Sequence, residues 1–218
     1  MEIFIDTANL DDIRKYADYG IIDGVTTNPA LIAKEGQNFL EVIEEICAIV
    51  DGPVSVEVVG NTSKEMINEA RRISKLHKNI VVKIPASLEG FKALKVLGQE
   101  IRTNFTIVYS SNQALLAAKL NATYVSPFVG RLDVNSTNGT NLINEIVKIY
   151  QNYNFQTKIL AASMRNSVYV KEAALSGAHV ATIPPEVIEP MMFNELTELS
   201  LDGFLKAWNE LPQNKKIF

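Results

Sequence analysis

Short runs of apolar and β-branched residues alternate with longer amphipathic stretches along the whole chain. Eight such runs stand out, at residues 3–5, 24–26, 54–58, 80–84, 104–108, 123–126, 158–162 and 180–183. Runs of this length and composition predict β-strands. Because most of them are apolar at successive positions, they are typical of strands that are buried on both faces.

The segments between the predicted strands carry helix signals. Residues that favour a helix N-cap precede four of them: Asn9, Thr62, Ser111 and Asn166. Glu65, three residues after Thr62, completes a capping box with it. Residues that favour a helix C-terminal cap follow three of them: Gly20, Asn121 and Gly177. The chain therefore alternates strand and helix from end to end.

This alternation predicts an α/β fold with a parallel sheet, because parallel neighbours need a crossover connection. Eight units, spaced on average by about 25 residues, favour closure into a (β/α)8 TIM barrel. An open, doubly wound sheet is the alternative, but no Gly-x-Gly-x-x-Gly follows the first strand and no Gly-rich lysine loop is present. We expect residues 1–218 to form a single barrel domain, with residues 201–218 as a C-terminal helical tail.

Composition and charge narrow the class of partner. The 218 residues are 47% hydrophobic and 21% charged, which suits one soluble globular domain. A net charge of −4 supplies no general field for nucleic acid or an anionic membrane. Any anionic ligand must therefore be held by local groups, and we expect neither nucleic acid nor membrane as a partner.

Compartment and metal chemistry follow from other features of the sequence. Cys47 is the single cysteine, and His77 and His179 lie too far apart for a histidine-rich metal motif. The N-terminus lacks the pattern of a signal peptide, and no apolar run approaches the ~18 residues of a membrane span. We expect a cytoplasmic protein without a metal site.

Polar residues stand at the ends of most predicted strands. In a closed barrel the active site lies at the C-terminal ends of the strands. The residues in these positions are Asp6, Asn28, Glu57, Lys83, Asn104, Thr106, Ser126, Ser163 and Arg165. Side chains two apart on a strand share a face, so Asn104 and Thr106 should both point inward; Ser163 and Arg165 should do so if their strand extends that far.

Lys83 lies in the most apolar of the predicted strands. Burial there favours the neutral, nucleophilic amine, which can form a Schiff base with a ketone. The alternative is a lysine whose stem packs on apolar neighbours while its ammonium reaches water. Asp6 and Glu57, taken singly, are as well explained as pairing partners or caps; together with Lys83 they indicate acid and base roles.

A phosphate site is indicated near the sixth and seventh strands. Arg131, Arg165 and Ser163 supply guanidinium and hydroxyl groups beside the start of a helix. Either arginine alone is equally consistent with a carboxylate partner such as Asp133. Asn28, which precedes a proline, is equally consistent with a turn residue.

Seven motifs together resemble the transaldolase family, and in particular its short-chain class, which includes the fructose-6-phosphate aldolases. The resemblance covers essentially the whole chain. The motifs are residues 4–8 (FIDTA), 23–29 (DGVTTNP), 56–58 (VEV), 82–85 (VKIP), 103–106 (TNFT), 124–131 (YVSPFVGR) and 162–166 (ASMRN).

The resemblance implies a role for each site residue. Lys83 is implied as the Schiff-base nucleophile and Asp6 as the acid/base at the cleaved bond. Glu57 and Thr106 are implied to hold a catalytic water. The remaining implied contacts are with the dihydroxyacetone unit, through Asn28, Asn104 and Ser126, and with the phosphate, through Arg131, Ser163 and Arg165. No cofactor is implied.

The implied reaction transfers dihydroxyacetone from sedoheptulose 7-phosphate or fructose 6-phosphate to glyceraldehyde 3-phosphate or erythrose 4-phosphate, in the pentose phosphate pathway. Glu57 and Phe128 resemble the transferases, whereas the aldolase subgroup typically has glutamine and tyrosine there. Val134 departs from the family, which often has a second acidic residue at that position. The alternatives are an aldolase that releases free dihydroxyacetone and a non-catalytic barrel that binds sugar phosphates.

The helical tail has apolar residues with no evident partner in the chain. Members of the short-chain class often form rings of five or ten subunits, with a C-terminal helix that reaches a neighbour. The resemblance therefore implies a homo-oligomer, a pentamer or a decamer, assembled through this helix.

Overall fold

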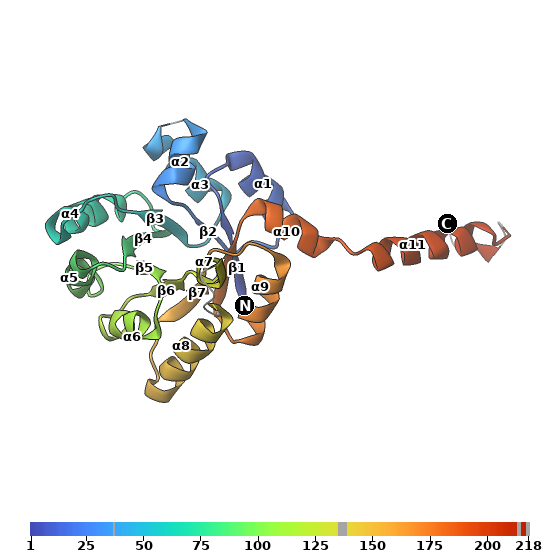
Figure 1. Cartoon of the computed structure of the whole chain (residues 1–218). Helices are drawn as coiled ribbons and strands as arrows, with labels where there is room; N and C mark the ends of the chain where they lie inside the picture. The colour runs from blue at the N-terminus through green and yellow to red at the C-terminus, as the bar shows by residue number, and fades with distance from the viewer. Residues whose placement is uncertain (37, 135–138, 213–214, 217–218) are drawn as a thin grey trace.

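Eight parallel strands form a closed barrel in the computed structural model, which describes all residues except 37, 135–138, 213–214 and 217–218. Each strand pairs with the next in the sequence, and β1 closes the barrel against β8 (Figure 1). The strands are β1 (Glu2–Asp6), β2 (Gly24–Thr26), β3 (Val54–Glu57), β4 (Ile80–Pro85), β5 (Thr103–Val108), β6 (Tyr124–Pro127), β7 (Lys158–Ala161) and β8 (Val180–Ile183). The predicted (β/α)8 barrel is confirmed.

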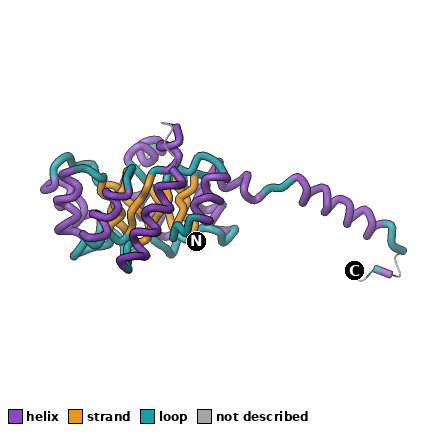
Figure 2. Tube along the Cα trace, turned by 60° about the horizontal axis from the view of Figure 1, so that its bottom comes forward, coloured by secondary structure: helices purple, strands orange, loops and turns teal. Residues whose placement is uncertain are grey.

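Helices surround the barrel on its outer side, except the last, which extends away from it (Figure 2). They are α1 (Leu10–Asp18), α2 (Pro29–Glu35), α3 (Phe39–Ile49), α4 (Ser63–Ile73), α5 (Leu88–Leu97), α6 (Ser111–Lys119), α7 (Val129–Val134), α8 (Gly139–Tyr153), α9 (Ser167–Leu175), α10 (Pro185–Met192) and α11 (Glu195–Asn209). Most of the buried apolar residues fill the layer between these helices and the strands.

The helix caps largely follow the sequence signals. Asn9 and Asn166 cap α1 and α9, and Thr62 forms the expected capping box with Glu65. The prediction of Ser111 as a cap is wrong by one residue. Ser110 is the N-cap of α6, because it forms a reciprocal capping box with Gln113.

A second, smaller cluster of apolar residues fills the inside of the barrel. Alternate strand residues point inward, so the residues two positions before the polar strand ends form one layer. That layer consists of Phe4, Val81, Tyr124, Leu160 and Val180, with Ala162 and Phe128 beside it. This packed layer lies directly beneath the polar residues at the strand ends.

The absence of a side chain at Gly24 makes room for the Phe4 ring. A Cβ atom at Gly24 would lie 2.6 Å from the Pro53 carbonyl oxygen and 2.8 Å from the Phe4 ring. We expect Gly24→Ala to lower the free energy of unfolding by about 3 kcal/mol, because a closed barrel cannot move either neighbour away. Thermal or denaturant unfolding measures this loss.

Gly203 provides the matched control for that substitution. It lies within α11, and a Cβ atom there would meet nothing within 4 Å. Gly203→Ala should leave stability unchanged or raise it by roughly 0.5 kcal/mol, because alanine favours a helix. Equal stability losses in the two variants would contradict the packing argument.

The chain beyond the barrel differs from the predicted tail. The first helix after β8, α10, packs onto the barrel with Val187 and Ile188 buried, and so completes the eighth unit. The separate helix α11 begins at Glu195, six residues before the predicted boundary at residue 201, because Asn194 caps it there. It contains no buried residue and projects away from the barrel (Figures 1 and 2). In the described part of the chain, no helix is long and apolar enough to cross a membrane.

Candidate active site

A cavity of about 160 Å³ lies at the C-terminal ends of the strands, above the inner apolar layer. Nine of the residues predicted from the sequence line it: Asp6, Asn28, Lys83, Asn104, Thr106, Ser126, Phe128, Arg131 and Ser163. They come from six of the eight barrel units, so closure of the barrel is what brings them together. Glu57 and Arg165 are the two predicted residues outside this lining.

Lys83 lies in the wall of this cavity, and only 6% of its surface is exposed. Its Nζ donates a hydrogen bond to the carbonyl oxygen of Thr27 at 2.7 Å. The same Nζ lies 3.1 Å from Oε2 of Glu57, the residue directly beside it in the β3–β4 register. The amine is thus held at the cavity by two oxygen partners rather than reaching bulk water, which excludes the alternative of a surface ammonium.

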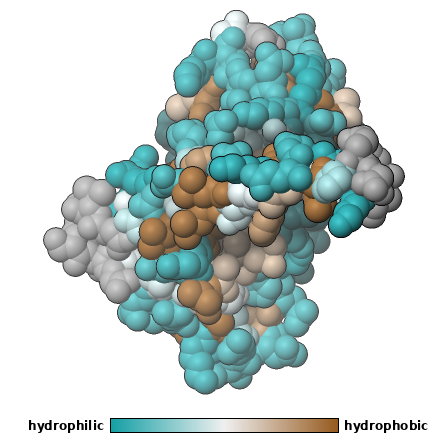
Figure 3. All heavy atoms as spheres, turned by 90° about the vertical axis from the view of Figure 1, so that its right-hand side faces the viewer, coloured by the Kyte–Doolittle hydropathy of each residue, from teal (hydrophilic) through white to brown (hydrophobic). Residues whose placement is uncertain are grey.

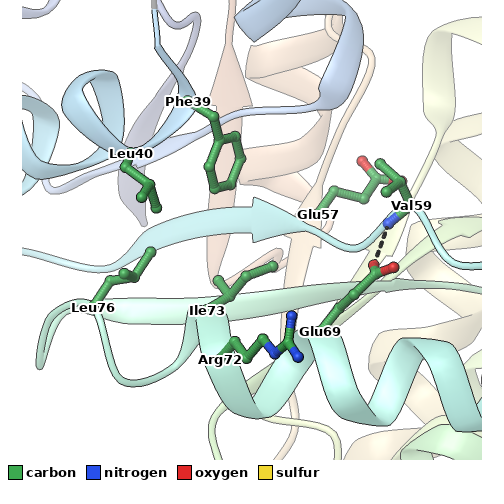
Figure 4. Close-up of a pocket in the computed structure, with 8 residues that line it drawn as sticks. All are labelled: Phe39, Leu40, Glu57, Val59, Glu69, Arg72, Ile73 and Leu76. Atoms are coloured by element: carbon green, nitrogen blue, oxygen red, sulfur yellow. Dashed lines mark hydrogen bonds between the residues drawn. The ribbon is translucent and has the colours of Figure 1, made fainter.

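Glu57 stands between the cavity and a separate groove on the outside of the barrel. That groove, of about 410 Å³, lies between α3 and α4, and Figure 4 shows its mainly apolar walls. Its few polar groups are partly engaged: Glu69 accepts a hydrogen bond from the backbone of Val59. A sugar phosphate needs convergent donors, so the smaller polar cavity at Lys83 is the better candidate site.

Asp6 faces the same cavity from β1. The Thr26 hydroxyl donates to its Oδ1 at 2.9 Å, and that hydroxyl also lies 2.6 Å from the hydroxyl of Thr182. Burial raises the pKa of Asp6 above its usual value, although the charge of Lys83 and the Thr26 hydrogen bond act in the opposite direction. A carboxyl with a raised pKa, close to a buried lysine, is suited to accept and return a proton.

Asn104 and Ser126 form a buried polar network with Ser55. Ser126 donates to Oδ1 of Asn104 at 2.6 Å, and Nδ2 of Asn104 donates to the Ser55 hydroxyl at 3.3 Å. All three residues are fully buried. The network fixes which end of the Asn104 amide faces each neighbour, so a ligand in the cavity meets a defined pattern of donors and acceptors.

The Thr106 hydroxyl is buried and has no hydrogen-bond partner among the described residues. Thr106 lines the cavity at a bulge in β5, where the pairing with β6 shifts between Phe105 and Val108. Within that bulge Ile107 has a φ of 61°, a strained conformation for a β-branched residue. An unpaired buried hydroxyl at a cavity wall is suited to hold a water or a substrate group.

Arg131 and Phe128 form one rim of the cavity. The Arg131 guanidinium lies 5.7 Å from the centre of the Phe128 ring, and Tyr109 packs edge-on against the same ring. The predicted alternative partner, Asp133, and the departure at Val134 concern side chains outside those that the structure describes.

Ser163 and Arg165 lie beyond the end of β7, so the condition under which both were expected to point inward is not met. The strand ends at Ala161, and Ser163 has a φ of 63°, which turns the chain away from the barrel axis. Arg165 is therefore exposed rather than inward-pointing, and its stem lies against Gly130. The Cγ and Cδ atoms of Arg165 lie beside Gly130, the residue that precedes Arg131 in the chain.

Asn28 has two functions in the structure. Its side-chain oxygen accepts from the backbone N–H of Leu31 and caps α2, and Pro29 follows at the first helical position. Asn28 also lines the cavity. Asn28 is thus the N-cap of a helix, where the alternative from the sequence was a turn residue, and it contributes to the cavity wall as well.

Three site residues were missed because β-strands commonly contain threonine and serine. These are Thr26 and Thr182, which line the cavity, and Ser55, which orients Asn104. The sequence signal that could have found them is their spacing along the strand. Each lies two residues from an inward polar residue or an inner-layer residue, and so on the same face of its strand. Among the described residues, no group of three or more His, Cys, Asp or Glu side chains is placed to hold a metal ion.

A barrel with a buried lysine, two carboxylates and a polar cavity at the strand ends has the arrangement of an enzyme active site. Residues 3–216 match the family described as transaldolase/fructose-6-phosphate aldolase. The chain belongs to this family.

Curated relatives agree with this membership. The chain is 54% identical over 215 residues to a probable transaldolase of Caldicellulosiruptor saccharolyticus, with 98% of this chain and 99% of that protein covered. It is 54% identical over 209 residues to a probable transaldolase of Clostridioides difficile, with 95% and 97% covered.

Solved structures that are similar share the fold alone. A mandelate oxidase variant matches with a TM-score of 0.59 at 11% identity, over 84% of this chain and 64% of that one. An inosine 5'-monophosphate dehydrogenase from Legionella pneumophila matches with a TM-score of 0.57 at 16% identity, over 86% and 58%. These matches support the barrel architecture.

Proposed function

We propose that this protein is a transaldolase that moves a dihydroxyacetone unit from a ketose phosphate to an aldose phosphate, as in the pentose phosphate pathway. The observation that carries the proposal is the buried Lys83 amine, held between Glu57 and the Thr27 carbonyl in the same cavity as Asp6. The probable transaldolases above support the substrate class.

The first steps use Lys83 and its neighbours. The neutral amine attacks the ketone carbon of the donor, and loss of water from the carbinolamine gives an iminium. Glu57, 3.1 Å from Nζ, is placed to take the amine proton. The unpaired Thr106 hydroxyl is suited to hold the water that carries protons between these groups.

Asp6 performs the cleavage and the transfer. It takes the proton from the hydroxyl on the carbon that becomes an aldehyde, and the electrons of the broken carbon–carbon bond pass into the iminium to give an enamine. The short aldehyde leaves and the acceptor enters. The enamine then attacks the acceptor carbonyl, Asp6 returns the proton, and hydrolysis frees Lys83.

Other polar groups in the cavity are suited to the rest of the substrate. Asn28, Asn104 and Ser126 offer hydrogen bonds to the hydroxyls of the dihydroxyacetone unit. Arg131 and Arg165, with Ser163, supply the positive charge and hydroxyl that a phosphate needs at the rim. This accounts for an anionic substrate on a chain whose net charge is −4.

Phe128 favours transfer over the release of free dihydroxyacetone. Its ring lines the cavity and has no hydroxyl to position a water at the enamine-derived adduct. With fructose 6-phosphate and erythrose 4-phosphate, we expect sedoheptulose 7-phosphate and glyceraldehyde 3-phosphate as products. Release of free dihydroxyacetone at a comparable rate would instead identify a fructose-6-phosphate aldolase.

Phe128→Tyr is expected to raise the ratio of dihydroxyacetone release to transfer by about tenfold, because the new hydroxyl can orient water. An enzymatic assay of free dihydroxyacetone, with and without erythrose 4-phosphate, measures the ratio. Phe155→Tyr is the matched control, since that ring packs against Tyr150 outside the cavity. An unchanged ratio in Phe128→Tyr would refute the assigned role of Phe128.

A non-catalytic sugar-phosphate binder is the alternative of another class. It predicts phosphate-dependent binding that survives Lys83→Met, with no turnover by the wild-type protein. A binder has no use for a buried lysine paired with a carboxylate, which is costly to bury. Turnover by the wild-type protein decides between the two functions.

We also propose that residues 1–218 act as one domain that assembles into a homo-oligomer, a pentamer or a decamer, through α11. The support is the exposure of apolar side chains on this helix: Leu196, Leu199, Phe204 and Leu205 are all more than half exposed. Figure 3 shows hydrophobic side chains on the side of the molecule from which α11 projects. Exposed apolar surface of this kind marks an interface.

Deletion of residues 195–218 should convert the assembly into monomers of the truncated chain, because it removes the helix and its apolar side chains together. Light scattering coupled to size exclusion measures the mass of the full chain and of the truncated chain. Lys206→Ala, on the same helix, should leave the mass unchanged. A monomeric full-length protein, or full assembly of the truncated chain, would rule out this proposal.

A further inference from the structure

Two buried threonines join Asp6 in a hydrogen-bonded chain across the top of the barrel. The Thr26 hydroxyl lies 2.9 Å from Oδ1 of Asp6 and 2.6 Å from the Thr182 hydroxyl. Thr26 is 2% exposed and Thr182 is 3% exposed. Because neither hydroxyl is exposed to bulk water, each needs a hydrogen-bond partner within the barrel.

The chain has one direction when Asp6 is ionised. A threonine hydroxyl carries a single hydrogen, and a carboxylate oxygen only accepts. The Thr26 hydroxyl therefore donates its hydrogen to Oδ1 of Asp6. In the short contact between the two threonines, the Thr182 hydroxyl must then be the donor and the Thr26 oxygen the acceptor. The other carboxylate oxygen, Oδ2, has no hydrogen bond to the described residues, and Asp6 lines the cavity.

We propose that Thr182 is a positioning residue: by donating to Thr26, it aligns the Thr26 hydrogen on Oδ1 of Asp6 and leaves Oδ2 as the oxygen that exchanges the substrate proton. This inference rests on the transaldolase function proposed above. During cleavage the proton of the substrate hydroxyl goes to Oδ2 while the carbon–oxygen bond becomes a carbonyl. During transfer Oδ2 returns the proton to the new alkoxide.

The sequence position of Thr182 suits this role. In the β1–β8 register Thr182 lies beside Phe4, and in the β1–β2 register Thr26 lies beside Asp6. Thr182 thus reaches Asp6 only through Thr26, across the closing seam of the barrel. A residue that acts through another should lose its effect when the intermediary is removed.

Several charges also act on Asp6, and a substitution at Thr182 leaves each of them in place. Lys83 from β4 stabilises the carboxylate, whereas Glu57 from β3 and Glu186 from α10 oppose it, and burial is the largest influence. A change in the pH dependence of a Thr182 variant therefore reports on the hydroxyl chain.

The test uses Thr182→Val, which removes the hydroxyl at nearly constant shape, and Thr182→Ser, which keeps it. We expect Thr182→Val to lower kcat about threefold to tenfold and to move the acid limb of the kcat profile upward by about half a pH unit, because the carboxylate loses an aligned donor. KM for fructose 6-phosphate should change less than twofold. Thr182→Ser should restore both values.

Two further variants make the result specific. In a Thr26→Val background, Thr182→Val should have no further effect on kcat. Thr103→Val is the matched control, because Thr103 is a fully buried strand threonine whose hydroxyl makes no hydrogen bond to the described residues. It should keep the wild-type pH profile. Thr182→Ala repeats the hydroxyl deletion if the valine variant folds poorly.

The proposal would be overturned if Thr182→Val and Thr182→Ala kept the wild-type kcat and the wild-type acid limb of the kcat–pH profile. It would also be overturned if the effect of Thr182→Val simply added to that of Thr26→Val. Borohydride trapping with fructose 6-phosphate separates this outcome from failure of the proposed function. An adduct on Lys83 in both the wild type and Thr182→Val, with unchanged turnover, overturns the role of Thr182 alone. Absence of the adduct in the wild type overturns the function itself.

Discussion

Lys83→Arg is expected to lower the rate of transfer from fructose 6-phosphate to erythrose 4-phosphate on the order of 10⁴-fold or more, because a guanidinium does not form the imine. Arginine keeps a cation beside Glu57, whose carboxylate lies 3.1 Å from Nζ in the wild type. Lys83→Met should lose as much activity but also about 3 kcal/mol of stability, because it leaves a mostly buried carboxylate without its partner. Initial rates and melting temperatures measure the two effects.

Lys158 is the matched control for these variants. It is another barrel lysine paired with a glutamate, Glu2, at 2.6 Å, but it lies at the opposite ends of the strands. Lys158→Arg should keep wild-type kcat. Substantial turnover by Lys83→Arg, or an equal loss in Lys158→Arg, would show that transfer does not depend on an amine at position 83.

Asp6→Asn is expected to lower kcat by about 10²–10⁴-fold, because an amide accepts the Thr26 hydrogen bond but takes no proton from the substrate. The adduct between substrate and Lys83 should still form, since it precedes cleavage. Single-turnover measurements separate adduct formation from cleavage. Loss of both steps to the same degree would place Asp6 in substrate binding instead.

The raised pKa of Asp6 gives this variant a second signature. Because burial raises the pKa above the usual 3.8, the ionised carboxylate is less stable in the folded chain than in the unfolded chain. At neutral pH the ionised group therefore destabilises the fold, and Asp6→Asn should melt at the same or a higher temperature. In the wild type, kcat should fall as acid protonates Asp6, with a midpoint above 3.8.

Much of the barrel follows from the order of elements in the sequence. All eight predicted strands are present, and Asn9, Thr62 and Asn166 cap helices as expected. These features depend on local sequence: apolar runs, cap residues and the need for a crossover between parallel strands. The predicted N-cap of α6, Ser111, was off by one residue from the actual cap, Ser110, because two adjacent serines offer the same signal.

The site was only partly predictable, for a physical reason. Asp6 and Lys83 are unusual in apolar strands, so their polarity alone marks them. Thr26 and Thr182 are ordinary strand residues, and their contact, which reaches past β1 from β2 to β8, exists only once the barrel closes. The outward turn before Arg165 depends on the positive φ of Ser163, which no local signal announces.

The C-terminal boundary shows the same limit. The apolar positions of α11 are visible in the sequence, but the division between α10 and α11 is set by which helix packs on the barrel. Val187 and Ile188 are buried, whereas no residue of α11 is. Packing of this kind is a tertiary property.

Borohydride reduction in the presence of fructose 6-phosphate, followed by peptide mass mapping, tests whether Lys83 carries the covalent intermediate. We expect one reduced dihydroxyacetone adduct, located on Lys83, in the wild type and in Lys158→Arg, and none in Lys83→Arg. Turnover of fructose 6-phosphate without any trapped adduct on Lys83, or with the adduct on another lysine, would contradict it.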